Sequence, residues 1–392
     1  MTQYQEFIPY IREHRTEDVR NLALRDRERL GDAMPFVMDQ INGWQKARTK
    51  IPSWAETEGI LYPVQLSMEQ CSSEATARYK ASLVSGKRFA DLTGGFGVDF
   101  SFIARNFESA TMVERREELC EIARHNMPLL GLPQAEVVND DGTAYLKRME
   151  PADVIFIDPA RRDQQGRKTV SIADCEPNLL EISETLRLKA GKVLIKYSPM
   201  LDISLAIKEL ETVIQTHIVS VDNECKELLF LLESGRKDAP IVNTCVNISK
   251  SGQNLFSFTQ EEERNSVATI AKSLDAYLYE PNSSVMKAGA YKCLSARFSV
   301  EKLETNSHLY TSNSLVENFP GRIFRIIKSF GMNKKEMKEG LKGIAKANLA
   351  VRNFPADVNT LRQKLNLKEG GETYIFATTH AGAHILILCE KI

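Results

Sequence analysis

Residues 91–100 read Asp91-Leu92-Thr93-Gly94-Gly95-Phe96-Gly97-Val98-Asp99-Phe100, with three glycines within four positions. It follows a short apolar segment, Arg88-Phe89-Ala90, and opens a segment in which Phe100, Ile103 and Ala104 share one helical face. Glycines between a strand and a helix let the backbone pass close to a ligand, and the start of the helix presents free N–H groups. The pattern therefore predicts a ligand-binding strand–turn–helix unit of an α/β sheet.

Further short apolar strands alternate with helical stretches after this unit. The predicted strands are 110–113, 135–138, 154–157 and 192–195, followed by 217–221 and 227–232. Nearly continuous apolar strands separated by helices are typical of a parallel sheet that is covered on both faces. The link 222–226 is too short for a crossover helix, which predicts an antiparallel last pair. The expected fold class is a doubly wound, Rossmann-like α/β core with a mostly parallel seven-stranded sheet and an antiparallel last strand.

The rest of the chain is predicted to form a helical N-terminal region and small α+β C-terminal domains. We assign residues 1–80 to the helical region, including a helix over 68–80 with Ser67 as its N-cap. The α/β core takes residues 81–258, and its last part, 242–248 and 255–258, is predicted to pair around a turn. Two small domains are predicted at 275–318 and 319–392, the second beginning as a basic helical segment and ending in strands 373–378 and 384–388.

Length and composition exclude several classes of protein. The 392 residues are 43% hydrophobic and 26% charged, which is typical of a globular chain with two to three domains. A chain that is basic throughout is excluded, because 51 Lys and Arg balance 52 Asp and Glu. The sequence shows no apolar run of membrane-spanning length and no signal-peptide pattern at its start. Seven scattered cysteines without a CxxC pair predict neither disulfides nor a metal cluster. We expect a soluble cytoplasmic protein without a metal.

Acidic residues follow the first four predicted strands at the edge where the glycine turn lies. Asp91 ends the first strand and Glu114 the second, while Asp141 and Asp158 follow the third and fourth. Open α/β sheets bind ligands at the carboxyl ends of their strands. Two cofactor classes use such a glycine turn, dinucleotides and S-adenosylmethionine, and a tight turn without a ligand is the alternative. The dinucleotide pattern GxGxxG would need a third glycine at Phe100, whereas Asp91 suits the ammonium group of a methionine moiety.

These residues together resemble a class I S-adenosylmethionine-dependent methyltransferase over about residues 87–233. The motifs that carry the resemblance are Asp91 to Gly97, Glu114, Asp141-Gly142 and Asp158-Pro159-Ala160-Arg161-Arg162. The resemblance implies that the cofactor is held by Asp91, Thr93, Gly95, Gly97, Glu114 and Asp141. In this arrangement Glu114 would accept the ribose hydroxyls and Asp141 the adenine amine. Thr93 stands where the family usually has glycine.

The fourth strand ends in a motif that is similar to two methyltransferase signatures. One is the Asp/Asn-Pro-Pro-aromatic signature of enzymes that methylate exocyclic amines, and the other is the Asp-Pro-Pro-Arg signature of RNA methyltransferases. A conjugated amine is a weak nucleophile, so a carboxylate that accepts its hydrogens can orient it for in-line transfer. Asp158 is therefore the predicted catalytic residue, with Pro159 fixing the turn and Arg161 holding phosphate. Ala160 replaces the second proline, and no aromatic residue follows it.

A basic segment near the C-terminus predicts an RNA-binding surface. Residues 321–352 contain nine Lys or Arg but only two acids, Glu336 and Glu339. A solvated helix face is the alternative. The predicted RNA contacts in this segment are Arg322, Lys334, Lys335, Lys338 and Lys342.

The C-terminal sequence also resembles two domains of known families. Residues 342–355 and 361–373 resemble the THUMP-like domain found with RNA methyltransferases, and residues 277–312 resemble the ferredoxin-like module that accompanies it. The second name describes a topology and implies no iron–sulfur cluster. The resemblance implies binding of structured RNA, tRNA or rRNA.

The sequence thus predicts an S-adenosylmethionine-dependent methyltransferase that modifies a nucleotide in structured RNA by direct in-line transfer. One alternative is a methyltransferase that acts on a small molecule or a protein. Another is a non-catalytic RNA-binding protein with a vestigial methyltransferase fold. A nicotinamide enzyme is a third, and Phe100 at the third glycine position argues against it.

Overall fold

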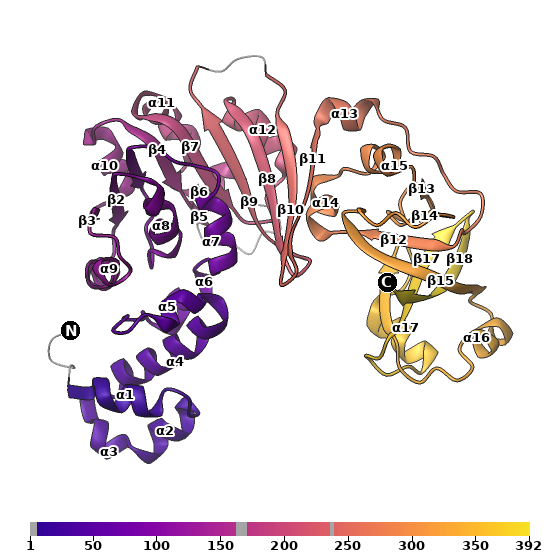
Figure 1. The fold of residues 1–392 in the computed structure, drawn as a ribbon, viewed down its shortest axis with the longest axis horizontal. Helices are drawn as coiled ribbons and strands as arrows, with labels where there is room; N and C mark the ends of the chain where they lie inside the picture. Colours follow the sequence, from indigo (N-terminus) through magenta and orange to yellow (C-terminus); the bar gives the residue numbers. More distant parts are fainter. Residues whose placement is uncertain (1–5, 162–170, 236–238) are drawn as a thin grey trace. The chain divides into compact units, whose positions relative to one another are not determined.

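The computed structural model describes residues 6–161, 171–235 and 239–392. Its chain divides into two compact units, which are described one after the other. The first unit comprises Met1–Ile214 and Leu228–Ala239, and the second comprises Gln215–Glu227 and Pro240–Ile392. Figure 1 traces the order of the elements along the chain.

The N-terminal region is helical, as predicted. Its elements are α1 (Ile8–His14), α2 (Val19–Arg25), α3 (Arg27–Leu30), η2 (Gly31–Ala33), α4 (Met34–Lys50), α5 (Pro52–Glu56), α6 (Gln65–Gln70) and α7 (Glu74–Ala81). A small core of its own includes Leu22, Val37 and Ile41, which are fully buried.

The predicted helix over 68–80 is wrong in one respect, because the chain forms two helices there. Residues 71–73, Cys71-Ser72-Ser73, separate α6 from α7. Ser73 rather than Ser67 is the N-cap of α7, and its Oγ accepts a hydrogen bond of 3.3 Å from the backbone N–H of Thr76. Consecutive serines favour such a cap over a helix interior, because their hydroxyls compete for backbone groups. The break leaves Ser72 outside both helices.

The large sheet has the expected mostly parallel core. Its strands are β1 (Arg88–Asp91), β2 (Ser109–Glu114), β3 (Ala135–Asn139), β4 (Ala152–Ile157), β7 (Ala190–Tyr197), β8 (Val213–Val221), β9 (Glu224–Glu233), β10 (Val242–Ser249) and β11 (Gly252–Thr259). The strand order is β11-β10-β8-β9-β7-β4-β1-β2-β3. Strand β9, the last strand of the predicted sheet, runs antiparallel to β7, which confirms the antiparallel last strand. The sheet has nine strands where seven were expected, because the β10–β11 hairpin joins it through a parallel pairing of β10 with β8.

Helices connect the parallel strands of the first unit. They are α8 (Val98–Ile103), η3 (Ala104–Asn106), α9 (Glu117–Leu129), α10 (Gly142–Arg148), η4 (Ile172–Asp174), α11 (Leu179–Lys189) and α12 (Ile203–Leu210), and a minor ladder pairs β5 (Ala160–Arg161) with β6 (Cys175–Glu176). Residues 154–157 of β4 are at most 1% exposed, which is why this strand reads as an unbroken apolar run.

The strand register sets the position of the acidic residues. Asp91 lies opposite Met112 of β2 and Phe156 of β4. Because the three strands run parallel, Glu114 and Asp158 come two residues later at the same edge of the sheet. The register therefore gathers at one edge residues that are far apart in the sequence.

The second unit contains a seven-stranded sheet. Its strands are β12 (Tyr277–Pro281), β13 (Glu301–Lys302), β14 (Tyr310–Ser312), β15 (Gly321–Gly331), β16 (Asn348–Arg352), β17 (Thr373–His380) and β18 (Ala383–Lys391), in the order β13-β14-β12-β15-β18-β17-β16. Its helices are α13 (Gln260–Asn265), α14 (Ser283–Ala288), α15 (Lys292–Phe298), α16 (Lys334–Gly340) and α17 (Val358–Leu365). The predicted strands 373–378 and 384–388 are confirmed as the antiparallel pair β17–β18.

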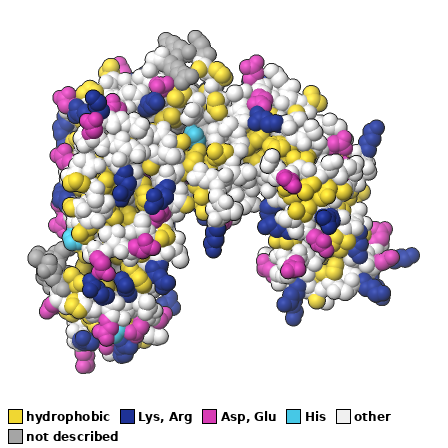
Figure 2. Space-filling model, viewed as in Figure 1, with side chains coloured by type: hydrophobic (Ala, Val, Ile, Leu, Met, Phe, Trp, Pro, Cys, Tyr) yellow, Lys and Arg dark blue, Asp and Glu magenta, His cyan; other side chains and the backbone are white. Residues whose placement is uncertain are grey.

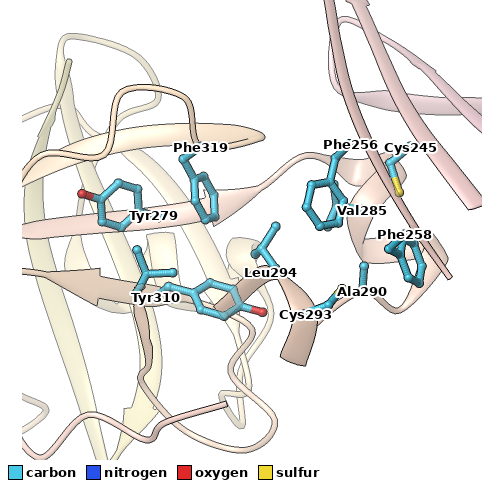
Figure 3. Close-up of a cluster of buried hydrophobic side chains, with 11 residues drawn as sticks. Cys245, Phe256, Phe258, Tyr279, Val285, Ala290, Cys293, Leu294, Tyr310 and Phe319 are labelled. Carbon is cyan, nitrogen blue, oxygen red and sulfur yellow. The ribbon is translucent and has the colours of Figure 1, made fainter. Parts of the chain in front are cut away.

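The β10–β11 hairpin shares a hydrophobic core with this second unit. Figure 3 shows Cys245 of β10 and Phe256 and Phe258 of β11 beside Val285 and Ala290. All five side chains are at most 4% exposed. Burial of these side chains places the hairpin in the second unit.

The basic segment after Pro320 does not begin as a helix, contrary to our prediction. Residues 321–331 form β15, and only the seven-residue helix α16 follows. Ile323, Phe324 and Ile326 favour a strand through their β-branched or aromatic side chains. The interspersed Arg and Lys residues hide this pattern, because they lie along a strand that buries little besides Phe324.

Candidate functional site

A cavity of about 350 Å³ lies at the carboxyl ends of the parallel strands of the first unit. Its size falls within the range of small-molecule sites, about 300–1,000 Å³. The lining includes every predicted cofactor residue and the predicted catalytic carboxylate: Asp91, Thr93, Gly95, Gly97, Glu114, Asp141 and Asp158. The cavity is also lined by Ser67, Gln70, Cys71 and Ser72 from α6 and the break that follows it.

The remaining predicted residues of the fourth-strand motif surround this cavity less directly. Pro159 is buried and is not part of the lining, whereas Ala160 is. Arg161 belongs to β5 by its backbone, and its side chain, like Arg162 and the following residues to 170, lies outside the described residues.

The glycine turn adopts a backbone that only glycine accepts readily. Gly95 and Gly97 have φ values of +55° and +86°, in the left-handed region. The N–H of Gly95 donates a hydrogen bond of 2.8 Å to Oε2 of Glu114, which ties the turn to the end of β2. Gly97 is the N-cap of α8. This hydrogen bond therefore joins the glycine turn directly to the acid of the second strand.

The helical N-terminal region packs directly on this turn. The ring of Trp54 meets the ring of Phe96 edge to face, with centroids 4.8 Å apart. Both side chains are at most 5% exposed. Asn126 of α9 adds two hydrogen bonds to the backbone of Leu61, accepting from its N–H at 2.9 Å and donating to its carbonyl at 2.8 Å. The N-terminal region is thus a structural part of the site.

Thr93, which departs from the usual glycine, bridges two of the acidic positions. Its backbone N–H donates to Oδ1 of Asp91 at 2.9 Å, and its hydroxyl donates to the same oxygen at 3.3 Å. The hydroxyl also accepts a hydrogen bond of 2.7 Å from the backbone N–H of Asp158. A glycine could make only the first of these bonds, so the departure links the ends of β1 and β4.

Asp91 is 1% exposed, and this burial dominates its chemistry. Burial raises the pKa of Asp91 to about 8, because a buried carboxylate loses its hydration. The N–H of Thr93 opposes the shift, while the negative charges of Asp99 and Asp158 add to it. A neighbouring cation would favour the ionised form of this carboxyl.

The other two predicted cofactor acids have different surroundings. Glu114 is 8% exposed, and its Oε1 accepts from the backbone N–H of Arg116 at 2.9 Å. Asp141 is exposed and is the N-cap of α10, where its Oδ1 accepts from the N–H of Ala144 at 2.9 Å. The next residue, Gly142, has no room for a side chain, because a Cβ there would lie 2.1 Å from the carbonyl oxygen of Leu92.

A chain of ion pairs reaches the cavity and was missed by the sequence reasoning. Nζ of Lys196 lies 2.5 Å from Oδ2 of Asp158 and 3.2 Å from Oδ2 of Asp99. Nζ of Lys80, which is fully buried, lies 3.1 Å from the other oxygen of Asp99. The available signal was a charged residue inside each of two apolar runs, Val98–Ile103 and Val193–Tyr197.

The predicted RNA contacts fall into two groups. Lys334, Lys335 and Lys338 are exposed on α16, and Lys342 is exposed shortly after it. In Figure 2 the Lys and Arg side chains of the second unit stand among acidic ones. Arg322 instead pairs with Glu280, which is 1% exposed and also binds Arg352 at 2.7 Å. Four of the five side chains are therefore open to a partner, and Arg322 is committed to an internal pair.

The described residues contain neither a membrane-spanning helix nor a cluster of metal ligands. Within residues 6–161, 171–235 and 239–392, no helix combines the length and the apolar character needed to span a membrane. The same residues contain no cluster of His, Cys, Asp and Glu suited to a metal ion.

We predict that Thr93→Val lowers the free energy of unfolding of the first unit by about 1–2 kcal/mol. Valine keeps the shape but removes the hydroxyl, so the N–H of Asp158 loses its acceptor. Urea unfolding followed by tryptophan fluorescence measures this, because both tryptophans, Trp44 and Trp54, lie in the first unit. Thr93→Ser, which keeps the hydroxyl, is the control, and equal stability of Thr93→Val and wild type would contradict the bridge.

Comparison with family models divides the chain into three matched segments. Residues 74–217 match the family described as conserved hypothetical protein 95, residues 277–320 match a ferredoxin-like domain, and residues 321–391 match a THUMP domain-like family. A search of curated proteins gave no match.

Among solved structures, a protein of Porphyromonas gingivalis W83 solved as a "putative methyltransferase" is similar over the whole chain. It is 32% identical, with 100% of this chain and 98% of that chain covered and a TM-score of 0.90. An rRNA methylase of Streptococcus thermophilus is 15% identical over 41% of this chain and 96% of its own, with a TM-score of 0.33. TrmK of M. capricolum, solved with S-adenosyl-homocysteine, is 14% identical over 42% and 70%, also at 0.33.

The two weaker likenesses carry no argument at these scores, whereas the first extends over both units of the chain. The strand order, the glycine turn and the three matched segments agree with it. The chain belongs to the same family as the P. gingivalis protein, and it combines a class I methyltransferase-like core with ferredoxin-like and THUMP-like domains.

Proposed function

We propose that this protein is an S-adenosylmethionine-dependent methyltransferase that modifies a nucleotide in structured RNA, either tRNA or rRNA. The observation that carries the proposal is the meeting of the glycine turn with Asp91, Glu114, Asp141 and Asp158 around one cavity. Kinship with a protein solved as a "putative methyltransferase" supports the reaction class. The THUMP-like match and the exposed lysines of α16 support RNA as the substrate.

The residues around the cavity fit the three parts of S-adenosylmethionine. Asp91 is a buried carboxyl that a cation would ionise, which suits the ammonium group. Among the described residues, Glu114 accepts from the N–H of Gly95 at Oε2 and from the backbone N–H and Nε of Arg116 at Oε1. This leaves a lone pair of Oε2 for a ribose hydroxyl. The exposed Asp141 at the cavity wall would accept from the adenine amine. When bound, S-adenosylmethionine supplies an electrophilic methyl group.

Asp158 is the residue that we assign to the acceptor nucleotide. Its Oδ2 is held by Lys196, whereas within the described part of the chain its Oδ1 has no hydrogen-bond partner. Oδ1 would accept an N–H of an exocyclic amine and so orient the nitrogen lone pair. The same carboxylate can take up the proton that the nitrogen loses after methylation. Pro159 keeps the backbone of this turn fixed.

The decisive experiment compares modified nucleosides by mass spectrometry in RNA from cells without this gene. We expect one methylated nucleoside to be absent, to return with the wild-type gene and to stay absent with Asp158→Ala. Glu150→Ala removes an exposed carboxylate just before β4 and is the matched control, which should restore the nucleoside. An unchanged set of methylated nucleosides in the cells that lack the gene would contradict RNA methylation.

Affinity for S-adenosylhomocysteine, which carries the same ammonium group, should rise with pH up to about 8. Below that pH the carboxyl of Asp91 holds a proton, because burial raises its pKa to about 8, and this proton must leave as the ammonium binds. We expect about a tenfold gain in affinity between pH 6.5 and 8.0, measured by titration calorimetry. Asp91→Asn should bind weakly and without this pH dependence. A constant affinity of the wild type over this range would refute the assignment of Asp91.

Exposed lysines of α16 should set the salt dependence of RNA binding. We expect the triple variant Lys334→Gln, Lys335→Gln and Lys338→Gln to weaken binding of total tRNA and to lower the slope of log K against log salt by about 2. Filter binding over a salt series measures both quantities. The matched control replaces three exposed lysines elsewhere in the second unit, Lys250, Lys272 and Lys292, by glutamine. Equal effects of the two triple variants would show that α16 is not the RNA contact.

A further inference from the structure

The ion pairs that end at Asp158 begin deep inside the first unit. Lys80 comes from α7, Asp99 from α8, Lys196 from β7 and Asp158 from the turn after β4. Their side chains are 0%, 10%, 13% and 37% exposed in that order. The chain of charges therefore runs from a fully buried ammonium to a carboxylate that lines the cavity.

Each internal member of this chain has two partners of opposite charge. Burial opposes ionisation of Asp99, but the positive charges of Lys80 and Lys196 outweigh it and lower the pKa of Asp99 to about 2. Two ammonium groups and two carboxylates alternate, so the set is neutral as a whole. Removing one partner of a buried ion leaves an uncompensated charge, which destabilises the folded state. The position of each charge therefore depends on the others.

The ammonium of Lys196 is fully engaged. It donates to Oγ of Ser72 at 3.1 Å and to Oδ2 of Asp99 at 3.2 Å, besides its 2.5 Å pair with Asp158. An ammonium group has three N–H donors, which is enough for the oxygens of Ser72, Asp99 and Asp158. Its position is fixed from three elements, and the oxygen of Asp158 that it holds is fixed with it.

Ser72 connects the helical N-terminal region to these ion pairs. Its Oγ donates a hydrogen bond of 2.7 Å to Oδ2 of Asp99 and receives the one from Lys196. Ser72 occupies this position because the chain breaks between α6 and α7. In a continuous helix over 68–80, Ser72 would be part of the helix and not of the segment between α6 and α7.

We propose that Lys196 is a positioning residue for the acceptor carboxylate Asp158, and that Asp99, Lys80 and Ser72 hold Lys196 in place. The proposal rests on the function proposed above, since it deepens the role of Asp158 in that reaction. Lys196 binds Oδ2 and leaves Oδ1 as the oxygen that meets the acceptor amine. A carboxylate held in this way presents one oxygen in one direction, which lowers the cost of orienting the nucleophile.

A double-mutant cycle tests whether Lys196 acts through Asp158. The assay follows transfer of labelled methyl from S-adenosylmethionine to total RNA from cells that lack the gene. We expect Lys196→Met to lower kcat about a hundredfold, while the affinity for S-adenosylhomocysteine changes less than threefold. In the Asp158→Asn background the same change should cost less than threefold, because the group that it positions is already altered. Equal losses in both backgrounds would overturn the proposal.

The matched control is Lys192→Met, which makes the same replacement on the same strand. Lys192 is 43% exposed and lies 3.8 Å from Glu233. It should leave kcat and the affinity for S-adenosylhomocysteine unchanged. Ser72→Ala is a milder change at the ammonium of Lys196 and should lower kcat about fivefold, which keeps the test open if Lys196→Met folds poorly. Full activity of Ser72→Ala together with full activity of Lys196→Met would overturn the proposal.

A second measurement does not depend on methyl transfer. Hydrogen–deuterium exchange of the peptide covering residues 154–161 reports on the amide of Asp158, which donates to Thr93. We expect exchange at this amide to be at least fivefold faster in Lys196→Met than in the wild type. In Lys192→Met the exchange rate should equal that of the wild type. Unchanged exchange in Lys196→Met would refute the positioning role. If the wild type transfers no methyl to RNA, the proposed function fails, and this exchange result still decides whether Lys196 holds the turn.

Discussion

The crowding of three carboxyl groups in and beside the core governs the site. Burial is the main reason that the pKa of Asp91 is raised, and the nearby charges of Asp99 and Asp158 raise it further. The three acids meet this constraint differently. Asp91 keeps a proton, Asp99 is ionised between two lysines, and Asp158 shares Lys196 while facing the cavity. The parallel register of β1 and β4 brings Asp91 near Asp158, and α8 adds Asp99. Lys80 of α7 and Lys196 of β7 offset the negative charge of Asp99.

Features encoded in neighbouring residues were predictable from the sequence. The glycine turn, the strands around it and the acids at their ends are local patterns, and the structure brings these residues together at one cavity. The ion chain was not predictable, because its pairs join residues far apart in sequence, such as Asp99 and Lys196. A charge in an apolar run shows that a partner is needed but does not say where the partner lies.

The basic C-terminal segment shows a second limit of sequence reasoning. Counting charges predicted an exposed surface, and the lysines of α16 are exposed. Arg322 has the same charge, but it forms an ion pair with the buried Glu280, which also pairs with Arg352. The apolar residues of β15 come mainly in adjacent pairs separated by cations and show no alternation, so a strand was mistaken for a helix. A count of charged residues gives the charge of each side chain but does not identify its ion-pair partner.

The pairing of β12 with β15 crosses the boundary between the ferredoxin-like and THUMP-like matches. One buried cluster also draws on both sides of it, with Leu278 and Leu309 packed in the same core as Phe324 and Ile387. Hydrogen bonds and core are shared, so neither part can lose its structure without exposing the apolar surface of the other. Two families of sequence thus meet in a single cooperative folding unit, and the residue at which one match ends and the next begins marks no point at which the molecule can be divided.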